Sequence, residues 1–221
     1  MPRNPAAKST APSPVELLWD GPKRAAARVL LAHGAGAGMD SPFMSMVARS
    51  LAARGVGVAR FEFPYMCRRR LQGARLPPDR APVLLEAFRR AAQQVAGAKG
   101  MGRLVIGGKS MGGRMASMLA DELGVRGLVC LGYPFHPPGQ PDKLRVEHLA
   151  ELDTPSLIVQ GTRDPFGTRA EVRGYTLAAA IRVAWVEDGD HDLAPRKRVV
   201  GDPAAARERW LHEVAEFVRG L

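Results

Sequence analysis

The segment RLVIGGKSMGGR, residues 103–114, constrains the fold of this chain more than any other. Its apolar residues predict a short buried strand at 104–106, and the residues from Arg114 onward predict a helix. The turn between them carries the pattern Gly-x-Ser-x-Gly at 108–112. Such a sharp strand-to-helix turn needs small neighbours, because larger side chains would collide with the strand and the helix. Ser110 is therefore a candidate nucleophile.

Strands and helices alternate along the rest of the chain. Short apolar or alternating runs predict six more strands, at residues 15–19, 29–32, 56–63, 127–132, 156–160 and 182–186. Apolar residues at helical spacing predict helices after Ser41-Pro42, from about Pro82 to Gly97, and after Asp202-Pro203. This alternation predicts an α/β fold, in which helices flank both faces of a mostly parallel sheet.

The length of 221 residues and a hydrophobic content of 46% suit one α/β domain, which we expect at residues 15–221. Residues 1–14 carry basic side chains without a following apolar run, so we predict a disordered tail and not a signal peptide. No run is long enough for a transmembrane helix, and we predict no membrane partner. Two cysteines, Cys67 and Cys130, do not make a disulfide framework, which favours a cytoplasmic location.

Four segments that could carry chemistry each follow a predicted strand. They are the glycine-rich loop at 33–38, the turn at Ser110, Asp164 and His191. In a doubly wound sheet, functional loops lie outside the carboxyl ends of the strands, so we expect these segments to meet at one edge. The order Ser, Asp, His along the chain is also the order found in α/β-hydrolases.

The residue types in these segments suit acyl transfer. A serine hydroxyl becomes nucleophilic when a base takes its proton, and His191 can do this near neutral pH. Asp164 would orient the imidazole and stabilise its charged form. The backbone N–H groups of Met111 and of the glycine-rich loop, best at Ala35, are candidates for an oxyanion hole. We also expect His33 to support the glycine-rich loop.

Other residues compete for the role of the acid. Three aspartates lie beside His191 in sequence, namely Asp188, Asp190 and Asp192. We favour Asp164, because it follows the strand from which this fold delivers the acid, whereas the other three lie too close in sequence to wrap behind the imidazole easily. No His-x-x-x-His or Cys-x-x-Cys pair exists, so we predict neither a metal site nor a cofactor.

Six segments spread over nearly the whole chain resemble one known family. They are HGAGAGMDSPFM (33–44), FEFPYM (61–66), GGKSMGGRMAS (107–117), YPFHPPGQP (133–141), QGTRDPFG (160–167) and DGDHDL (188–193). Together they resemble the small α/β-hydrolase-like family that also supplies a domain of the chromatin NSL complex and a testis-expressed protein. The resemblance implies an α/β-hydrolase fold and carries over Ser110, Asp164 and His191 as the triad positions. It implies no particular substrate.

The connection before the predicted acid-bearing strand is short. Residues 133–155 leave room for one short helix near 146–152, so we expect no large cap domain. We predict an open or shallow cleft, which suits small esters or thioesters better than long acyl chains. The residues expected to line or border it are Gly34, Gly36, Tyr65, Phe135 and His136.

The net charge of +10 is uneven, because eight arginines lie between residues 60 and 90. Arg68, Arg69 and Arg70 lie in an arginine-rich connection, expected at residues 67–80, that follows a predicted strand near the expected rim. There they either attract anionic substrates or form a solvated face. The chain has no recognised nucleic-acid-binding motif, so we predict no nucleic-acid partner.

The sequence as a whole favours a serine hydrolase that cleaves a small-molecule ester or thioester through an acyl-enzyme on Ser110. The alternative is a non-catalytic binding or scaffold module that shares the fold, since a fold does not by itself establish a function. The sequence does not indicate an oligomeric state.

Overall fold

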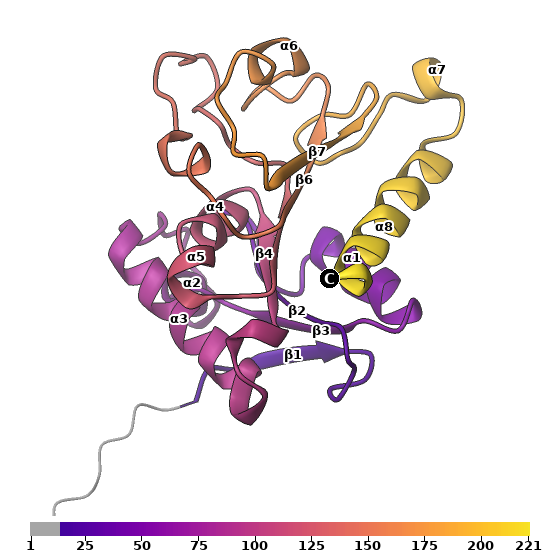
Figure 1. Ribbon diagram of the computed structural model, residues 1–221. Coiled ribbons are helices and arrows are strands. Elements are labelled where there is room, and N and C mark those ends of the chain that lie inside the picture. Colours follow the sequence, from indigo (N-terminus) through magenta and orange to yellow (C-terminus); the bar gives the residue numbers. More distant parts are fainter. Residues whose placement is uncertain (1–13) are drawn as a thin grey trace, which may run out of the picture.

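Seven strands of the described chain form one twisted sheet through the middle of the molecule (Figure 1). The computed structural model describes residues 14–221, so the tail predicted at residues 1–14 lies, apart from Pro14, outside the described residues. In spatial order the strands are β1 (Leu17–Asp20), β3 (Gly57–Phe61), β2 (Arg28–Ala32), β4 (Val105–Lys109), β5 (Gly127–Leu131), β6 (Ser156–Gly161) and β7 (Ile181–Val186). β1 runs antiparallel to β3, and every other pairing is parallel. The prediction of a mostly parallel sheet is confirmed.

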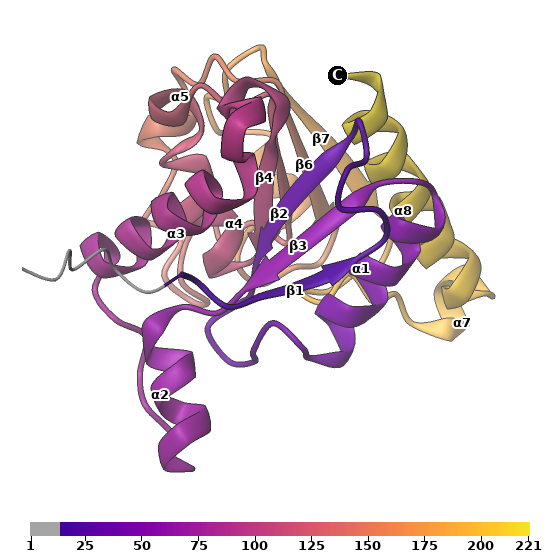
Figure 2. The same ribbon diagram turned by 90° about the horizontal axis from the view of Figure 1, so that it is seen from below.

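Helices cover both faces of this sheet, as Figures 1 and 2 show. One face is covered by α1 (Pro42–Ala53) and α8 (Pro203–Gly220), and the other by α3 (Ala81–Ala96), α4 (Met111–Ser117) and α5 (Ala120–Leu123). The remaining described helices lie in connections: α2 (Pro64–Gln72), η1 (Gly97–Lys99), η2 (Met101–Arg103), η3 (Glu147–Leu149), α6 (Arg169–Val172) and α7 (Lys197–Val200).

Two of the long helices begin at the residues that the sequence indicated. Ser41 is the N-cap of α1, where its side chain accepts a hydrogen bond from the Met44 N–H. The Asp202 carboxylate caps α8 by accepting hydrogen bonds from the N–H groups of Ala204 and Ala205. Each cap is followed by proline, whose fixed φ suits the first helical position and which has no N–H to satisfy.

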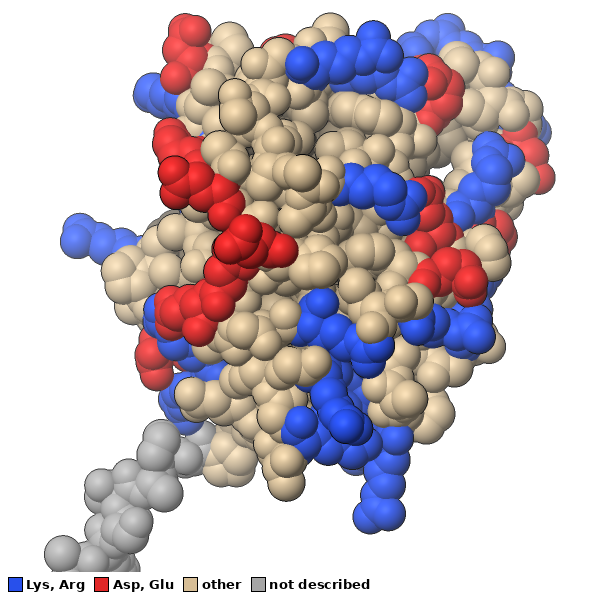
Figure 3. All heavy atoms as spheres, in the orientation of Figure 1, with Lys and Arg blue, Asp and Glu red and all other residues tan. Residues whose placement is uncertain are grey.

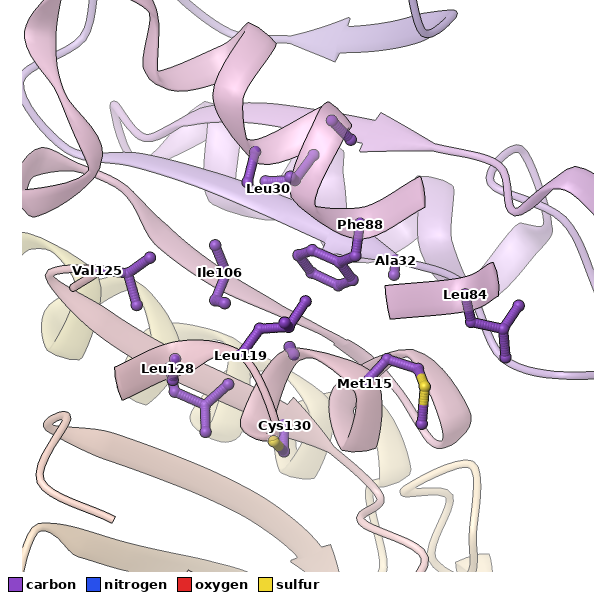
Figure 4. Packing of buried hydrophobic residues seen from close by; sticks show 14 of the residues in the cluster. Leu30, Ala32, Leu84, Phe88, Ile106, Met115, Leu119, Val125, Leu128 and Cys130 are labelled. Atoms are coloured by element: carbon purple, nitrogen blue, oxygen red, sulfur yellow. The ribbon is translucent and has the colours of Figure 1, made fainter. Parts of the chain in front are cut away.

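Alternating residues of the central strands supply two apolar layers, one on each face of the sheet. On the face shown in Figure 4, Leu30 and Ile106 from the sheet lie under Phe88 of α3, with Leu119 beside them. The adjacent strand residue Leu31 points to the opposite layer, beneath α1 and α8. Each fully buried side chain of this size stabilises the fold by about 1.5–3 kcal/mol, so the two layers hold the strand ends in fixed positions.

Two connections bear on the site. The arginine-rich stretch was expected to be a connection over residues 67–80, but its first part is the helix α2, which starts at Pro64. The segment between β5 and β6 holds no regular element longer than the three-residue η3. Within the described residues there is thus no large cap domain, which confirms that prediction.

The surface in Figure 3 mixes both signs of charge. Lys and Arg side chains gather toward the lower edge of this face, while Asp and Glu lie among them higher up. In the part of the chain that the structure describes, no helix combines the length and the apolar character needed to cross a membrane.

Candidate active site

Ser110 lies at the sharp turn between β4 and α4, in a conformation that few serines adopt. Its φ of 50° and ψ of −115° are outside the regions that most L-residues occupy. A Cβ added to Gly108 would come within 2.4 Å of the Ala32 carbonyl oxygen, and one added to Gly112 within 2.5 Å of the same atom. The two glycines therefore permit the close approach of β2 that this turn requires.

A continuous chain of hydrogen bonds joins Ser110 to His191 and Asp164. Ser110 Oγ lies 2.8 Å from His191 Nε2, and His191 Nδ1 lies 2.9 Å from Asp164 Oδ2. The carboxylate can only accept, so Nδ1 carries a proton, and Nε2 is left free to accept the serine hydroxyl. This arrangement gives Ser110 a base within reach and gives that base a negative charge behind it.

The Asp164 carboxylate is held from both sides in a fully buried position. The Gln160 side-chain amide donates to Asp164 Oδ2 at 2.9 Å, and the Phe166 N–H donates to Oδ1 at 2.9 Å. Because both oxygens also accept from groups other than His191, the carboxylate cannot rotate away without losing hydrogen bonds in a buried site.

The three competing aspartates contact groups other than the His191 ring. Asp188 forms an ion pair with Arg196, which lowers the pKa of that carboxyl to about 2. Asp190 accepts hydrogen bonds from the N–H groups of Asp192 and of Ala194, so it stabilises the turn at residues 190–194. The Asp192 carboxylate faces the Lys109 ammonium at 3.3 Å. The geometry therefore favours Asp164 as the partner of His191.

His191 is also held by two residues that sequence reasoning did not select. The Phe166 ring stacks on the imidazole, with their centroids 4.1 Å apart. The Lys109 ammonium, which is nearly buried, donates to the His191 carbonyl oxygen at 2.7 Å. Burial lowers the pKa of Lys109, and Asp192 opposes that shift. Their places in the sequence could have indicated both residues, because Lys109 directly precedes Ser110 and Phe166 lies two residues after Asp164.

The glycine-rich loop is fixed from beneath by His33, as expected. His33 is fully buried; its Nε2 accepts from the Phe63 N–H at 3.1 Å, and its Nδ1 lies 2.7 Å from the Gly34 carbonyl oxygen. These contacts require a neutral ring with the proton on Nδ1. Burial lowers the pKa of His33, which keeps the ring neutral.

The two N–H groups expected at an oxyanion hole are available. Met111 is the first residue of α4, so its N–H has no acceptor within the helix. Among the described residues, the Ala35 N–H also meets no acceptor, while the Ala35 carbonyl oxygen accepts from the Tyr65 hydroxyl. Ala35 and Ser110 line the same cavity.

Comparison with known proteins shows the family of this chain. The sequence model of the alpha/beta hydrolase domain family matches residues 25–219. This chain belongs to that family. Among solved structures, similarity extends to a dienelactone hydrolase from Anabaena variabilis, at 21% identity over 92% of this chain and 90% of that one, with a TM-score of 0.69.

Two other solved structures share the fold. One is an alpha-beta serine hydrolase homologue from Coxiella burnetii, at 18% identity, 94% and 91% coverage of this chain and that one, and a TM-score of 0.66. The other, from Xanthomonas campestris, is described as an a/b serine hydrolase without a lid, at 22% identity, 88% coverage of each chain and a TM-score of 0.58. At these identities the likeness shows a shared fold.

Two cavities of this α/β-hydrolase domain meet at Ser110, and both are also lined by Ala35 and Phe166. The histidine-side cavity, of about 300 Å³, adds His191 and Lys109. Its other lining residues are Gly34, Gly36, Ala37, Ser41, Phe43, Met44 and Asp192. The structure thus puts the predicted cleft residues Gly34 and Gly36 at the site.

The arginine-side cavity, of about 310 Å³, lies on the other side of Ser110. Its remaining lining residues are Pro78, Asp79, Ala81, Leu84, Met111, Arg114, Met115, Pro134 and Arg145. Sequence reasoning did not find this second cavity, because its walls come from segments that lie far apart in the chain.

Three residues predicted to border the cleft lie elsewhere in this α/β-hydrolase domain, and none of them lines either cavity. Tyr65 is fully buried beneath the glycine-rich loop, where its hydroxyl donates to the Ala35 carbonyl oxygen at 3.0 Å. Phe135 is also fully buried, and His136 is 2% exposed with its Nε2 3.5 Å from Glu171. The prediction was wrong because rings at strand ends gain more by packing under the loops than by remaining at a rim.

The arginines after β3 are largely occupied by partners. Arg68 contacts Asp79 at 2.5 Å, and Arg70 pairs with Asp40 and Glu62. Arg69 donates to the Ala35 carbonyl oxygen at 3.5 Å. Their charges therefore stabilise the loops around the site, and the two ion-paired guanidinium groups are not free to bind an anion.

Proposed function

We propose that this protein is a serine hydrolase that cleaves a small carboxylic ester or thioester through an acyl-enzyme on Ser110. The observation that carries the proposal is the unbroken hydrogen-bond chain from Ser110 Oγ through His191 to the buried Asp164. It is supported by the two cavities, because a nucleophile without an accessible space beside it could not receive a substrate.

In the first half of the proposed reaction, Ser110 Oγ attacks the ester carbonyl carbon while its proton passes to His191 Nε2. The carbonyl oxygen becomes an oxyanion, and in this proposal the N–H groups of Ala35 and Met111 donate hydrogen bonds to it. The tetrahedral intermediate then collapses: the bond to the alcohol or thiol breaks, and His191 gives its proton to that leaving group. Ser110 is left acylated.

In the second half, water replaces the leaving group. His191 takes a proton from the water, whose oxygen attacks the acyl carbon, and the proton returns to Ser110 Oγ as the acid departs. Asp164 stays ionised throughout and stabilises the imidazolium that forms twice in the cycle. Phe166 and Lys109 keep the ring and its backbone in place.

The narrower resemblance, to the domain found in the chromatin NSL complex and in a testis-expressed protein, stays a prediction, as does the cytoplasmic location. A scaffold role without catalysis would need neither a base at 2.8 Å from the serine nor space on both sides of it. We therefore treat that role as an outcome of the test below.

Labelling with a fluorophosphonate tests the proposal without a guess at the substrate. We expect Ser110 to be the modified residue, and we expect Ser110→Ala to lose both labelling and ester turnover while its melting temperature shows that it folds. At least about a 10³-fold loss of turnover is expected when a nucleophile of this kind is removed.

A matched control is offered by Ser117 in the same helix. Ser117 Oγ lies 2.9 Å from His148 Nε2, but Ser117 is buried, and no carboxylate among residues 14–221 pairs with that histidine. Ser117→Ala should keep its labelling. Unmodified Ser110 together with no ester turnover by the wild-type protein would contradict the proposal and favour the scaffold role. Full turnover by Ser110→Ala would contradict the assignment of Ser110 as the nucleophile.

A further inference from the structure

The arginine-side cavity is lined by two arginines for which the described residues, 14–221, supply no counter-ion. Arg114 comes from α4, one turn beyond Ser110, and Arg145 comes from the loop between β5 and β6. In the part of the chain that the structure describes, neither side chain has a carboxylate within ion-pair distance. The Arg114 Nε atom is buried and has no hydrogen-bond partner.

The one acidic residue in this cavity is already engaged. Asp79 pairs with Arg68 at 2.5 Å, so the two charges of that pair offset each other. Two positive charges, on Arg114 and Arg145, therefore remain uncompensated by the described residues at the wall.

The two guanidinium groups also act on each other. The pKa of Arg145 is lowered, first by burial and next by the positive charge of Arg114. Like charges brought together and partly desolvated disfavour the folded state unless an anion joins them. Two such positive charges lower the stability of the free protein, as binding sites commonly do. We therefore expect this arrangement where an anionic ligand compensates the charges.

The remaining walls set the shape of the ligand. Beside Ser110, the cavity is lined by apolar side chains, namely Pro78, Ala81, Leu84, Met115 and Pro134. Its volume of about 310 Å³ has room for a short chain or a single ring. A group that extends from a carbonyl at Ser110 into this cavity would pass apolar walls before it meets the two guanidinium groups.

We propose that Arg114 and Arg145 bind an anionic oxygen group, a carboxylate or a phosphate, on the portion of the substrate that occupies the arginine-side cavity. Guanidinium groups suit both anions because their parallel N–H groups match two oxygens of either. The proposal rests on the proposed hydrolase function and narrows its substrate class to anionic esters or thioesters. It also assigns anion binding to Arg114 and Arg145, which have no ion-pair partner among the described residues, in place of Arg68, Arg69 and Arg70, which all have hydrogen-bond or ion-pair partners.

The experiment compares esters that differ in one charged group. One pair varies the acyl side, with mono-p-nitrophenyl glutarate against p-nitrophenyl butyrate, and a second varies the leaving group, with 4-carboxyphenyl butyrate against phenyl butyrate. The readout is the ratio of kcat/KM for the anionic ester to that for the neutral one. We expect Arg114→Gln combined with Arg145→Gln to lower this ratio about 10- to 100-fold for the pair whose anion enters the cavity.

Arg75→Gln is the control for the general charge of the protein, because it makes one substitution of the same kind at an exposed position in the arginine-rich stretch. We expect this variant to keep the ratio within about twofold. An equal fall in Arg75→Gln would show that the general field of the protein attracts the anion, and would overturn the site. So would a ratio that the double variant leaves unchanged for both ester pairs. A melting temperature no lower than that of the wild type would show that the double variant folds.

A second readout needs no turnover, which separates a failure of this site from a failure of the hydrolase function. Glutarate and inorganic phosphate are titrated by calorimetry into Ser110→Ala, with and without the two arginine substitutions. Binding of either probe that the arginine substitutions weaken at least about tenfold would support the site and tell carboxylate from phosphate. Binding of neither probe, or binding that the substitutions do not weaken, would overturn it, even in a protein that hydrolyses neutral esters.

Discussion

The two cavities that meet at Ser110 differ in how their charged side chains are compensated. On the histidine side, the Lys109 ammonium donates to the His191 carbonyl oxygen and faces Asp192. On the arginine side, Arg114 and Arg145 have no such partners among the described residues. A charged side chain that is paired with other groups of the protein holds those groups in position. A charged side chain without such a pair can bind a charged group of a ligand. We infer that one side holds the catalytic groups and the other recognises substrate.

Among substitutions that distinguish the two cavities, we expect Asp164→Asn to change kcat the most. The amide would favour the imidazole tautomer that carries its proton on Nε2, and such a ring cannot accept from Ser110. We expect kcat for a neutral ester to fall about 10⁴-fold, with the ratio of anionic to neutral kcat/KM largely kept, as measured in steady-state assays.

The matched control for this substitution is Asp190→Asn, because Asp190 closes the same loop without contacting the imidazole. We expect its loss of kcat to be less than about tenfold. If Asp190→Asn lost kcat about 10⁴-fold and Asp164→Asn lost less than about tenfold, Asp190 and not Asp164 would be the acid that supports His191.

A smaller effect is expected from Lys109→Met, which keeps the length of the side chain but removes its ammonium. The His191 carbonyl oxygen loses a charge-assisted hydrogen bond, so the imidazole is held less firmly against Ser110. We expect kcat to fall about 10- to 100-fold, while Lys143→Met, an exposed control, changes little. The ratio of kcat/KM for the anionic ester to that for the neutral ester should stay near the wild-type value in Lys109→Met. If it fell as far as in the variant that lacks Arg114 and Arg145, the two cavities would not have separate roles.

The smallest effect concerns pH and His33, which supports the wall of the histidine-side cavity. Burial lowers the pKa of His33 in the folded state, so below about pH 6.5 the unfolded chain binds more protons than the folded one. The free energy of unfolding should therefore fall as the pH drops below 6.5, by at most about 1.4 kcal/mol per pH unit from this group. Urea unfolding at several pH values between 7.5 and 5.5 measures the slope.

His33→Asn should reduce that slope, although it also weakens the loop. His148, whose pKa burial lowers too, contributes in the same direction and leaves part of the slope in place. Equal slopes for wild type and His33→Asn would show that this ring carries no share of the pH dependence.

The features that the sequence predicted well depend on neighbours along the chain. The caps at Ser41 and Asp202 are local, because each side chain bonds an N–H two or three residues away. The turn at Ser110 also depends mainly on residues near it in the sequence, because Gly108 and Gly112 are the residues that let β2 pack close to it. These patterns, repeated along the chain, were enough to predict the layered α/β fold.

The features that the sequence did not predict depend on residues distant in the chain. The helix α2 is stabilised partly across the molecule, where Arg70 meets Asp40 and Glu62. Arg114 and Arg145 come from different segments, and no periodicity relates them. Tyr65 was misjudged for the same reason, because its burial depends on the glycine-rich loop about thirty residues earlier in the sequence.

The position of β7 has a consequence for the timing of synthesis. β7 is the last strand in the chain and lies at an edge of the sheet, paired with β6. His191 follows it, whereas the turn that holds Ser110 is complete some eighty residues earlier. While the chain emerges from the ribosome, the earlier strands can therefore pair and form the turn before the base exists. In the proposed mechanism, a nascent chain would therefore lack its catalytic base until β7 docks on β6.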